Sequence, residues 1–291
     1  MTGTDPDIKL SIANSLWADK GTQLKPDFIK NNEDNYDAKL SELDFNSPEA
    51  LTTINGWVND NTEGKIPKII KKIEPGTFLY LINAIYFKGS WTDKFDKAKT
   101  VEKPFTLEDG NKKNVQMMAK SGEFSYYKED NFQAVNLPYG KGNTSMYLFL
   151  PENDKDDSFY KSLNSENWDK WISSFSKKRG ALELPRFKIE YENKLNDTLK
   201  NLGMTVAFSS GANFKKMVDG TAYISEVMHK TFAEVNEEGT EAAAATSVAI
   251  SKSAILPGES FKMAVEHPFF CAITDKKTGE IIFMGTISEP K

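Results

Sequence analysis

Residues 237–258 read EEGTEAAAATSVAISKSAILPG, and this stretch decides how the rest of the chain is interpreted. Four consecutive alanines ordinarily favour a helix. However, Gly239 precedes them and Thr, Ser, Val and Ile follow, a composition that favours extended backbone. The stretch is also longer than an ordinary connection between two elements, and such long loops are usually functional or disordered. It is therefore either a flexible alanine loop or a strand held outside a sheet.

A two-residue period gives this stretch one uniform face. Successive side chains of an extended strand point to opposite faces, and small or β-branched uncharged residues occupy every second position. These residues are Thr240, Ala242, Ala244, Thr246 and Val248. Glu241 falls on the opposite face, and Gly239 supplies the backbone freedom that a hinge needs. The pattern is typical of a strand buried in a sheet, although the stretch lies where a chain should be exposed.

The elements around this stretch alternate irregularly between helix and strand, which predicts the α+β class with large sheets dominating the later half. Ser47, Pro48 and Glu49 form a strong helix start, because a serine cap, a proline at the first position and an acidic first turn all stabilise one. The apolar run 77–87 predicts a strand covered on both faces. Further strands are expected at 10–17, 146–150, 189–191, 222–235, 261–265, 269–274 and 281–287, and further helices at 26–36, 165–176 and 194–202.

Length and composition predict one globular domain over residues 1–291, and they give no support for binding to nucleic acid or to membranes. The sequence holds 291 residues, near the upper limit for one domain, and shows no repeat or linker. A net charge of −5 gives no general attraction to nucleic acid or to an anionic membrane. No apolar window reaches the length of a membrane span, and the first residues do not form a signal peptide.

The chemistry of the chain favours a protein that is not an enzyme. Cys271, the single cysteine, lies in an apolar run and is interpreted as a buried small residue and not as a nucleophile. The two histidines, His229 and His267, lie outside the usual motifs of hydrolases and zinc enzymes, which favours structural roles. A hydrolase with one of them near a serine stays an alternative. The sequence predicts no metal and no cofactor.

Three stretches now make the chain resemble the serpin family. HKTFAEVNEEGTEAAAAT at 229–246 is similar to the fifth strand of the family's sheet A and its reactive-loop hinge. NAIYFKGSW at 83–91 is similar to the third strand of the same sheet, and FKMAVEHPFFCAITDKKTGEIIFMGTISEP at 261–290 to the family's closing strands. The resemblance covers essentially the whole chain. It implies the serpin fold, with large mixed and antiparallel sheets, surrounding helices and an exposed reactive loop.

The resemblance also implies a function, namely inhibition of a serine protease as a suicide substrate. The protease cleaves the loop and forms an acyl-enzyme, the hinge inserts into sheet A, and the enzyme is carried along and distorted. Small uncharged residues permit insertion because burying a charge is strongly disfavoured. The hinge comprises Glu238, Gly239, Thr240, Glu241, Ala242, Ala243, Ala244, Ala245 and Thr246.

Family spacing implies that the bond Ser253–Ala254 is cleaved, since Ser253 lies fourteen residues after Gly239 and fifteen before Pro268. A small residue there suits an elastase-like or other small-pocket protease. A register shifted to Lys252 would suit a trypsin-like one.

Three further residues take conformational roles by resemblance. Asn83 and His229 match the polar cluster where sheet A opens, the shutter, and Trp91 matches the tryptophan at the top of that sheet, the breach. None of these roles is catalytic.

The sequence departs from the family at its start, because complete members have several helices before the strand matched by 10–17. The resemblance therefore implies an N-terminally incomplete domain, with association through exposed sheet surface or loop–sheet pairing. We expect the 291-residue chain alone to trap proteases poorly. A non-inhibitory relative acting as chaperone, carrier or storage protein is the alternative. The resemblance favours an extracellular or cell-envelope location.

Overall fold

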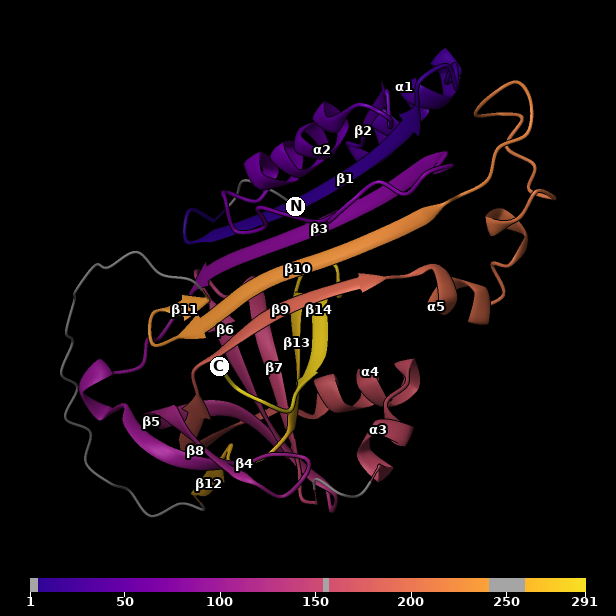
Figure 1. The fold of residues 1–291 in the computed structure, drawn as a ribbon. Helices are drawn as coiled ribbons and strands as arrows, with labels where there is room; N and C mark the ends of the chain where they lie inside the picture. The colour runs from indigo at the N-terminus through magenta and orange to yellow at the C-terminus, as the bar shows by residue number, and fades with distance from the viewer. Residues whose placement is uncertain (1–4, 154–156, 241–259) are drawn as a thin grey trace.

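The computed structural model describes residues 5–153, 157–240 and 260–291 (Figure 1). Two sheets dominate it, as the sequence predicted. The six-stranded sheet has the order β2-β1-β3-β11-β10-β9, and the eight-stranded sheet has the order β12-β8-β5-β6-β7-β13-β14, with β4 paired to β5. Residues 241–259 lie outside the described residues, and with them the predicted hinge residues Glu241 to Thr246 and the predicted reactive bond.

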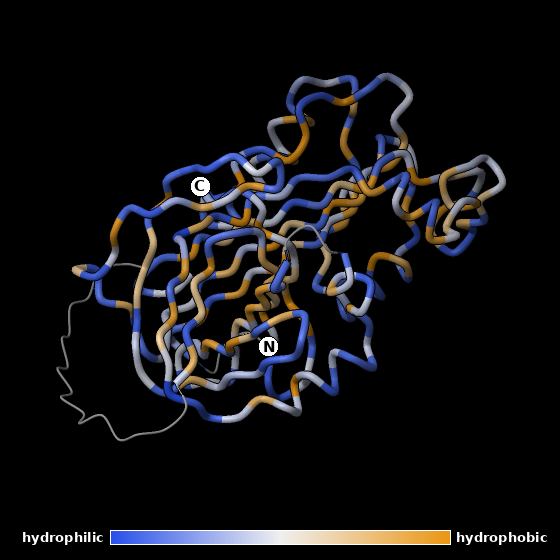
Figure 2. Tube along the Cα trace, turned by 90° about the horizontal axis from the view of Figure 1, so that it is seen from below, coloured by the Kyte–Doolittle hydropathy of each residue, from blue (hydrophilic) through white to orange (hydrophobic). Residues whose placement is uncertain are grey.

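The strands of the six-stranded sheet are β1 (Ile8–Asp19), β2 (Lys39–Leu43), β3 (Leu79–Ser90), β9 (Phe187–Lys194), β10 (Glu226–Asn236) and β11 (Gly239–Thr240). Those of the eight-stranded sheet are β4 (Val101–Thr106), β5 (Lys112–Lys128), β6 (Phe132–Tyr139), β7 (Thr144–Pro151), β8 (Ser176–Pro185), β12 (Phe261–Ala264), β13 (Phe269–Asp275) and β14 (Ile281–Ile287). The chain changes repeatedly between apolar and polar residues along the strands (Figure 2), as layers with one buried face require.

The described helices lie beside the two sheets or, for α5, beyond the end of β9 (Figure 1). They are α1 (Pro26–Tyr36), α2 (Pro48–Asn61), α3 (Ser158–Ser162), α4 (Ser165–Ser174) and α5 (Asn196–Asn201), with short 3-10 turns η1 (Lys97–Lys99) and η2 (Val206–Phe208). The predicted start of α2 is confirmed, because the Ser47 side chain accepts the Glu49 amide N–H at 3.4 Å and Pro48 follows the cap. Helices α1 and α2 lie along the six-stranded sheet, whereas α3 and α4 lie beside the eight-stranded one (Figure 1).

Strand β3 lies inside the six-stranded sheet, but the predicted burial of both its faces is only half right. Tyr80, Ile82 and Ala84 are buried in one cluster with the apolar face of α2. The residues that alternate with them, 81, 83 and 85, are only partly buried. We call this second side the rear face of the sheet, and Ile12 and Tyr191 on it are each 48% exposed.

Two predicted elements are shorter than expected, for local reasons. The strand expected at 222–235 begins only at Glu226, because Ala222 and Ile224 leave the sheet and pack into a separate cluster with Leu79. The helix expected at 194–202 is the short α5, and Gly203 ends it with a φ of 99°.

Candidate functional site

The hinge begins inside the six-stranded sheet. Strand β11 lies between β3 and β10, where Gly239 pairs with Ser90 and Thr240 with Gly89. Gly239 has a φ of 146°, and a Cβ atom on it would lie 2.0 Å from the Gly89 carbonyl oxygen. No larger residue fits at this point, so a glycine is required.

Thr240 shows which side of the hinge faces inward. Its side chain is fully buried, and its hydroxyl lies 2.7 Å from the hydroxyl of Tyr139. The Tyr139 ring in turn stacks on Trp91 with ring centroids 4.3 Å apart. The side of β11 that carries Thr240 therefore faces the core between the two sheets.

Beyond β11 the two flanking strands close on each other. Strand β10 pairs directly with β3 in parallel, from Glu226 opposite Tyr80 to Phe232 opposite Tyr86. Parallel pairs are slightly less stable per residue than antiparallel ones. Between β3 and β10, the short strand β11 is thus antiparallel to both neighbours, and where β11 ends the two neighbours pair with each other in parallel.

A buried carboxylate anchors the turn between β10 and β11. The Glu237 side chain is 2% exposed, and Arg186 Nη2 and Nε donate hydrogen bonds to its Oε1 at 2.6 and 2.9 Å. Thr100 also donates a hydrogen bond to it at 2.5 Å. Burial is the largest single influence and would raise the pKa of Glu237, but the hydrogen bonds from Arg186 and Thr100 outweigh it and lower the pKa below its ordinary value.

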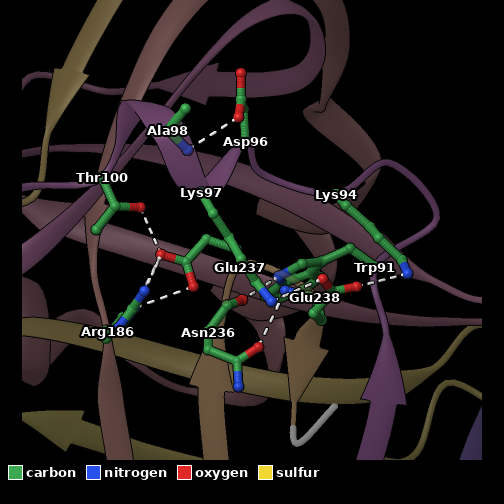
Figure 3. A network of polar contacts seen from close by, with 10 residues as sticks. All are labelled: Trp91, Lys94, Asp96, Lys97, Ala98, Thr100, Arg186, Asn236, Glu237 and Glu238. Carbon is green, nitrogen blue, oxygen red and sulfur yellow. Dashed lines mark hydrogen bonds and ion pairs between the residues drawn. The ribbon is translucent and has the colours of Figure 1, made fainter. Parts of the chain in front are cut away.

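A second network holds the neighbouring carboxylate and the end of β10 (Figure 3). Glu238 is 14% exposed and pairs with Lys94 at 2.6 Å and with Lys97 at 3.2 Å. Trp91 donates its indole N–H to the Asn236 carbonyl oxygen at 2.9 Å and its backbone N–H to the Glu238 carbonyl oxygen at 2.8 Å. The segment after β3 therefore fixes where the hinge leaves the sheet.

The rear face carries a row of polar residues across neighbouring strands. His229 Nδ1 lies 2.8 Å from Asn83 Oδ1, and Asn83 Nδ2 donates to Asn14 Oδ1 at 2.7 Å. Asn14, Asn83 and His229 are directly opposite one another in the register of β1, β3 and β10. Asn83 and His229, predicted to lie together, are thus in contact. They join β3 and β10 in the part of the sheet where these two strands pair directly.

His229 should make stability depend on pH. Burial lowers its pKa below the ordinary value of 6.5. The unfolded chain therefore binds more protons than the folded chain between the two pKa values, so stability is complete above about pH 6.5 and falls as pH drops through the lower, folded pKa. We expect the melting temperature to fall between about pH 7.5 and pH 5.5, and His229→Gln, which cannot gain a proton, to fall less. Equal falls in both proteins would contradict this assignment.

The other groups considered for chemistry do not form a site. His267 Nδ1 lies 3.2 Å from the Pro268 carbonyl oxygen, in the connection between β12 and β13 and away from His229 in β10. Cys271 is buried, and burial raises the pKa of its thiol to about 12, so the thiolate is strongly disfavoured. Among residues 5–153, 157–240 and 260–291, no group of three or more His, Cys, Asp or Glu side chains could hold a metal ion. In the same ranges no helix is long and apolar enough to cross a membrane.

Four residues of the site had escaped the sequence prediction. Lys94, Lys97 and Thr100 come from the connection between β3 and β4, and Arg186 comes from the connection between β8 and β9. Nothing in their local sequence marks them as partners of Glu237 or Glu238. Trp91, by contrast, lies where it was expected, at the end of the sheet beside the hinge.

Comparisons with known proteins agree with this geometry. The family model described as Serpin (serine protease inhibitor) matches residues 1–290, and the chain therefore belongs to the serpin family. The leukocyte elastase inhibitor of Homo sapiens is 37% identical over 296 residues, covering 97% of this chain and 78% of that protein.

Solved structures extend the likeness to the fold. The native state of tengpin, a thermophilic serpin, has a TM-score of 0.91 at 36% identity and covers 99% of this chain and 75% of that one. Human thyroxine-binding globulin, in a complex with thyroxine, has a TM-score of 0.90 at 26% identity, covering 99% of this chain and 77% of that one.

Proposed function

We propose that this chain inhibits serine proteases as a suicide substrate. One observation carries the proposal: Gly239 and Thr240 already occupy a place between β3 and β10, with Thr240 buried and facing the core. A strand that continued in this register would place Ala242 beside the buried Phe87. On its other side, Ala243 and Ala245 would lie beside Tyr86 and Ala84, which are also buried. The hinge sequence is therefore suited to insertion at the place where insertion has begun.

In the proposed reaction the serine hydroxyl of the protease attacks the carbonyl carbon of Ser253. The bond to Ala254 breaks, the new amino group of Ala254 leaves with a proton, and the protease stays bound to Ser253 as an ester. The cut frees the hinge to extend between β3 and β10. There it replaces the parallel pairing of these two strands by two antiparallel pairings, one with each of them. The new pairings supply the driving force that distorts the bound enzyme.

We infer a target with a small specificity pocket, since Ser253 would enter that pocket. The name of the leukocyte elastase inhibitor relatives supports an elastase-like enzyme. A trypsin-like enzyme that cleaves after Lys252 is the alternative. Both bonds lie outside the described residues, so the choice depends on sequence spacing.

A panel of serine proteases tests this proposal. An elastase-like enzyme should form an SDS-resistant complex with the chain and release the peptide 254–291, which mass spectrometry distinguishes from 253–291. Release of 253–291 by a trypsin-like enzyme would select the alternative. Cleavage by every enzyme without any complex would contradict inhibition.

We also expect the 291-residue chain alone to capture only a small share of the enzyme that cleaves it. Part of the rear face is open, with Ile12 and Tyr191 each 48% exposed, and exposed apolar surface favours association over insertion. Counting molecules of chain consumed per molecule of elastase inhibited measures this. A ratio near one would show the expectation to be wrong.

A carrier function is the second candidate, because a protein of the same fold has been solved in complex with thyroxine. A carrier need not gain stability when its loop is cleaved. The comparison of cleaved and uncleaved chain described in the Discussion separates the two functions.

A further inference from the structure

A cavity of about 230 Å³ lies next to the hinge, between the segment after β3 and strands β5 and β6. Its walls are largely apolar and come from Trp91, Phe95, Phe124, Leu137 and Pro138. Six polar side chains also line it, namely Asp93, Lys120, Glu123, Ser125, Asn136 and Lys177. The hinge contacts described above use Trp91 but none of these polar side chains.

Lys120 brings a buried ammonium group to this cavity. Its side chain is 14% exposed, and Nζ donates to the backbone oxygen and to Oδ2 of Asp93 at 2.5 and 2.6 Å. The same Nζ lies 5.6 Å from the ring centroid of Phe95 and 5.9 Å from that of Phe124. The Asp93 side chain is 79% exposed, so water competes with Lys120 for its carboxylate, which can turn outward. An ammonium carries three donors, and two of them are accounted for.

Asn136 brings a second donor. Among the described residues, its Nδ2 is the buried side-chain nitrogen or oxygen that has no hydrogen-bond partner. An amide left in that state lowers stability by about 1–3 kcal/mol, and each such group calls for an explanation. The cavity therefore combines apolar walls with donors that are short of acceptors.

We propose that this cavity binds a small aromatic carboxylate. The ring would pack between Trp91 and Phe124, and the carboxylate would accept hydrogen bonds from Lys120 and, after a small shift of its side chain, from Asn136. The Asp93 carboxylate turns into water, and Glu123 at the rim is already paired with Lys177 at 2.9 Å. A volume of about 230 Å³ lies below the usual range of drug sites, about 300–1,000 Å³, which restricts the ligand to one or two rings.

Such a ligand would act on the hinge through the wall that the two sites share. Trp91 holds the backbone of Asn236 and Glu238, and the Phe95 amide donates to the Glu237 carbonyl oxygen at 2.9 Å. A ring packed against Trp91 and Phe95 stabilises this segment in the described conformation. The carboxylate is thus a stabiliser of the uninserted hinge, and its binding does not depend on protease inhibition.

Calorimetric titration of the full uncleaved chain tests the site, with indole-3-propionate as probe. The matched compounds are indole-3-propanol, which has the ring without the charge, and propionate, which has the charge without the ring. We expect the acid to bind at least about tenfold more tightly than either, because a charge-assisted hydrogen bond is worth about that factor. Equal binding of acid and alcohol, or no binding at millimolar concentration, would overturn the proposal.

Three variants locate the site. Lys120→Met and Asn136→Leu should each weaken binding of the acid, the first by about tenfold or more, whereas Lys161→Met, 79% exposed and outside the cavity lining, should leave it unchanged. Asn136→Leu removes an unpaired group and is expected to fold, so the test does not depend on Lys120→Met alone. Bound acid should also slow hydrogen exchange of the 237–240 amides. Unchanged affinity in both cavity variants, or unchanged exchange with acid bound, would contradict the assignment.

Discussion

Replacing Ala242 by arginine should convert the chain from an inhibitor into a substrate. Extending the register of β11 along β3 places residue 242 beside Phe87, which is fully buried between the sheets. A guanidinium there would lose its water without gaining a partner, at several kcal/mol. Insertion should stall, so that the ester hydrolyses and the protease is released. The share of elastase held as SDS-resistant complex should fall at least about tenfold relative to the unmodified chain.

Glu241→Arg is the matched control for this substitution. The same register places residue 241 beside Lys88, on the opposite side of the strand. The sequence already carries a charge at 241, so an arginine there should change complex formation by less than about threefold. If both variants lose the complex equally, the two positions do not alternate between buried and exposed sides and the proposed register is wrong.

Arg186→Ala should be the most destabilising single change in the network around the hinge. It leaves the Glu237 carboxylate, 2% exposed, with only the hydroxyl of Thr100 as a side-chain partner. The Arg186 side chain is itself 40% exposed, so the loss lies at the lower end of the cost of breaking a buried ion pair, about 3 kcal/mol. For a chain of this size that lowers the melting temperature by about 6–12 °C.

Two further substitutions distinguish the loss of the pair with the buried Glu237 carboxylate from the loss of a positive charge alone. Arg186→Lys keeps the charge but loses the two-pronged geometry, so we expect an intermediate loss. Lys188→Ala breaks a surface pair, in which Lys188 lies 3.7 Å from Glu234 and is 45% exposed, and should cost less than about 1 kcal/mol. Equal losses for Arg186→Ala and Lys188→Ala, measured by urea unfolding, would show that Glu237 does not depend on Arg186.

The parts of the site that could be predicted from the sequence are short and contiguous. Gly239 stands out because a glycine interrupts a β-favouring sequence, and the structure gives the reason, namely the close approach of the Gly89 carbonyl oxygen. His229 and Asn83 were paired through the family resemblance, since they lie in separate strands. Their register in β10 and β3 brings them into contact.

The ion pairs of the hinge could not be predicted in this way. Arg186 and Glu237 are separated by 51 residues, and the contact depends on how β9 aligns with β10. No periodicity in either strand encodes that alignment. In the sequence, Lys94 and Lys97 cannot be told from other surface lysines. They pair with Glu238 only because the turn after β10 places Glu238 between them.

Strand β5 shows the same limit at the level of the fold. Its 17 residues, Lys112–Lys128, alternate poorly between apolar and polar, because the strand changes neighbours along its length. It pairs with β4 near its start, with β6 near its end and with β8 over much of its length. Each neighbour buries different positions, so no single two-residue period runs through the strand.

The measurement that tests insertion most directly is the melting temperature of the chain before and after its loop is cut. Cleavage at 253–254, confirmed by mass spectrometry, should raise the melting temperature by about 10 °C or more. The inserted strand gains backbone hydrogen bonds on both sides, worth about 0.5–1.5 kcal/mol each. Ala242→Arg should lose most of this gain. A cleaved chain that melts at or below the temperature of the uncleaved one would contradict insertion between β3 and β10, and with it the proposed inhibitory mechanism.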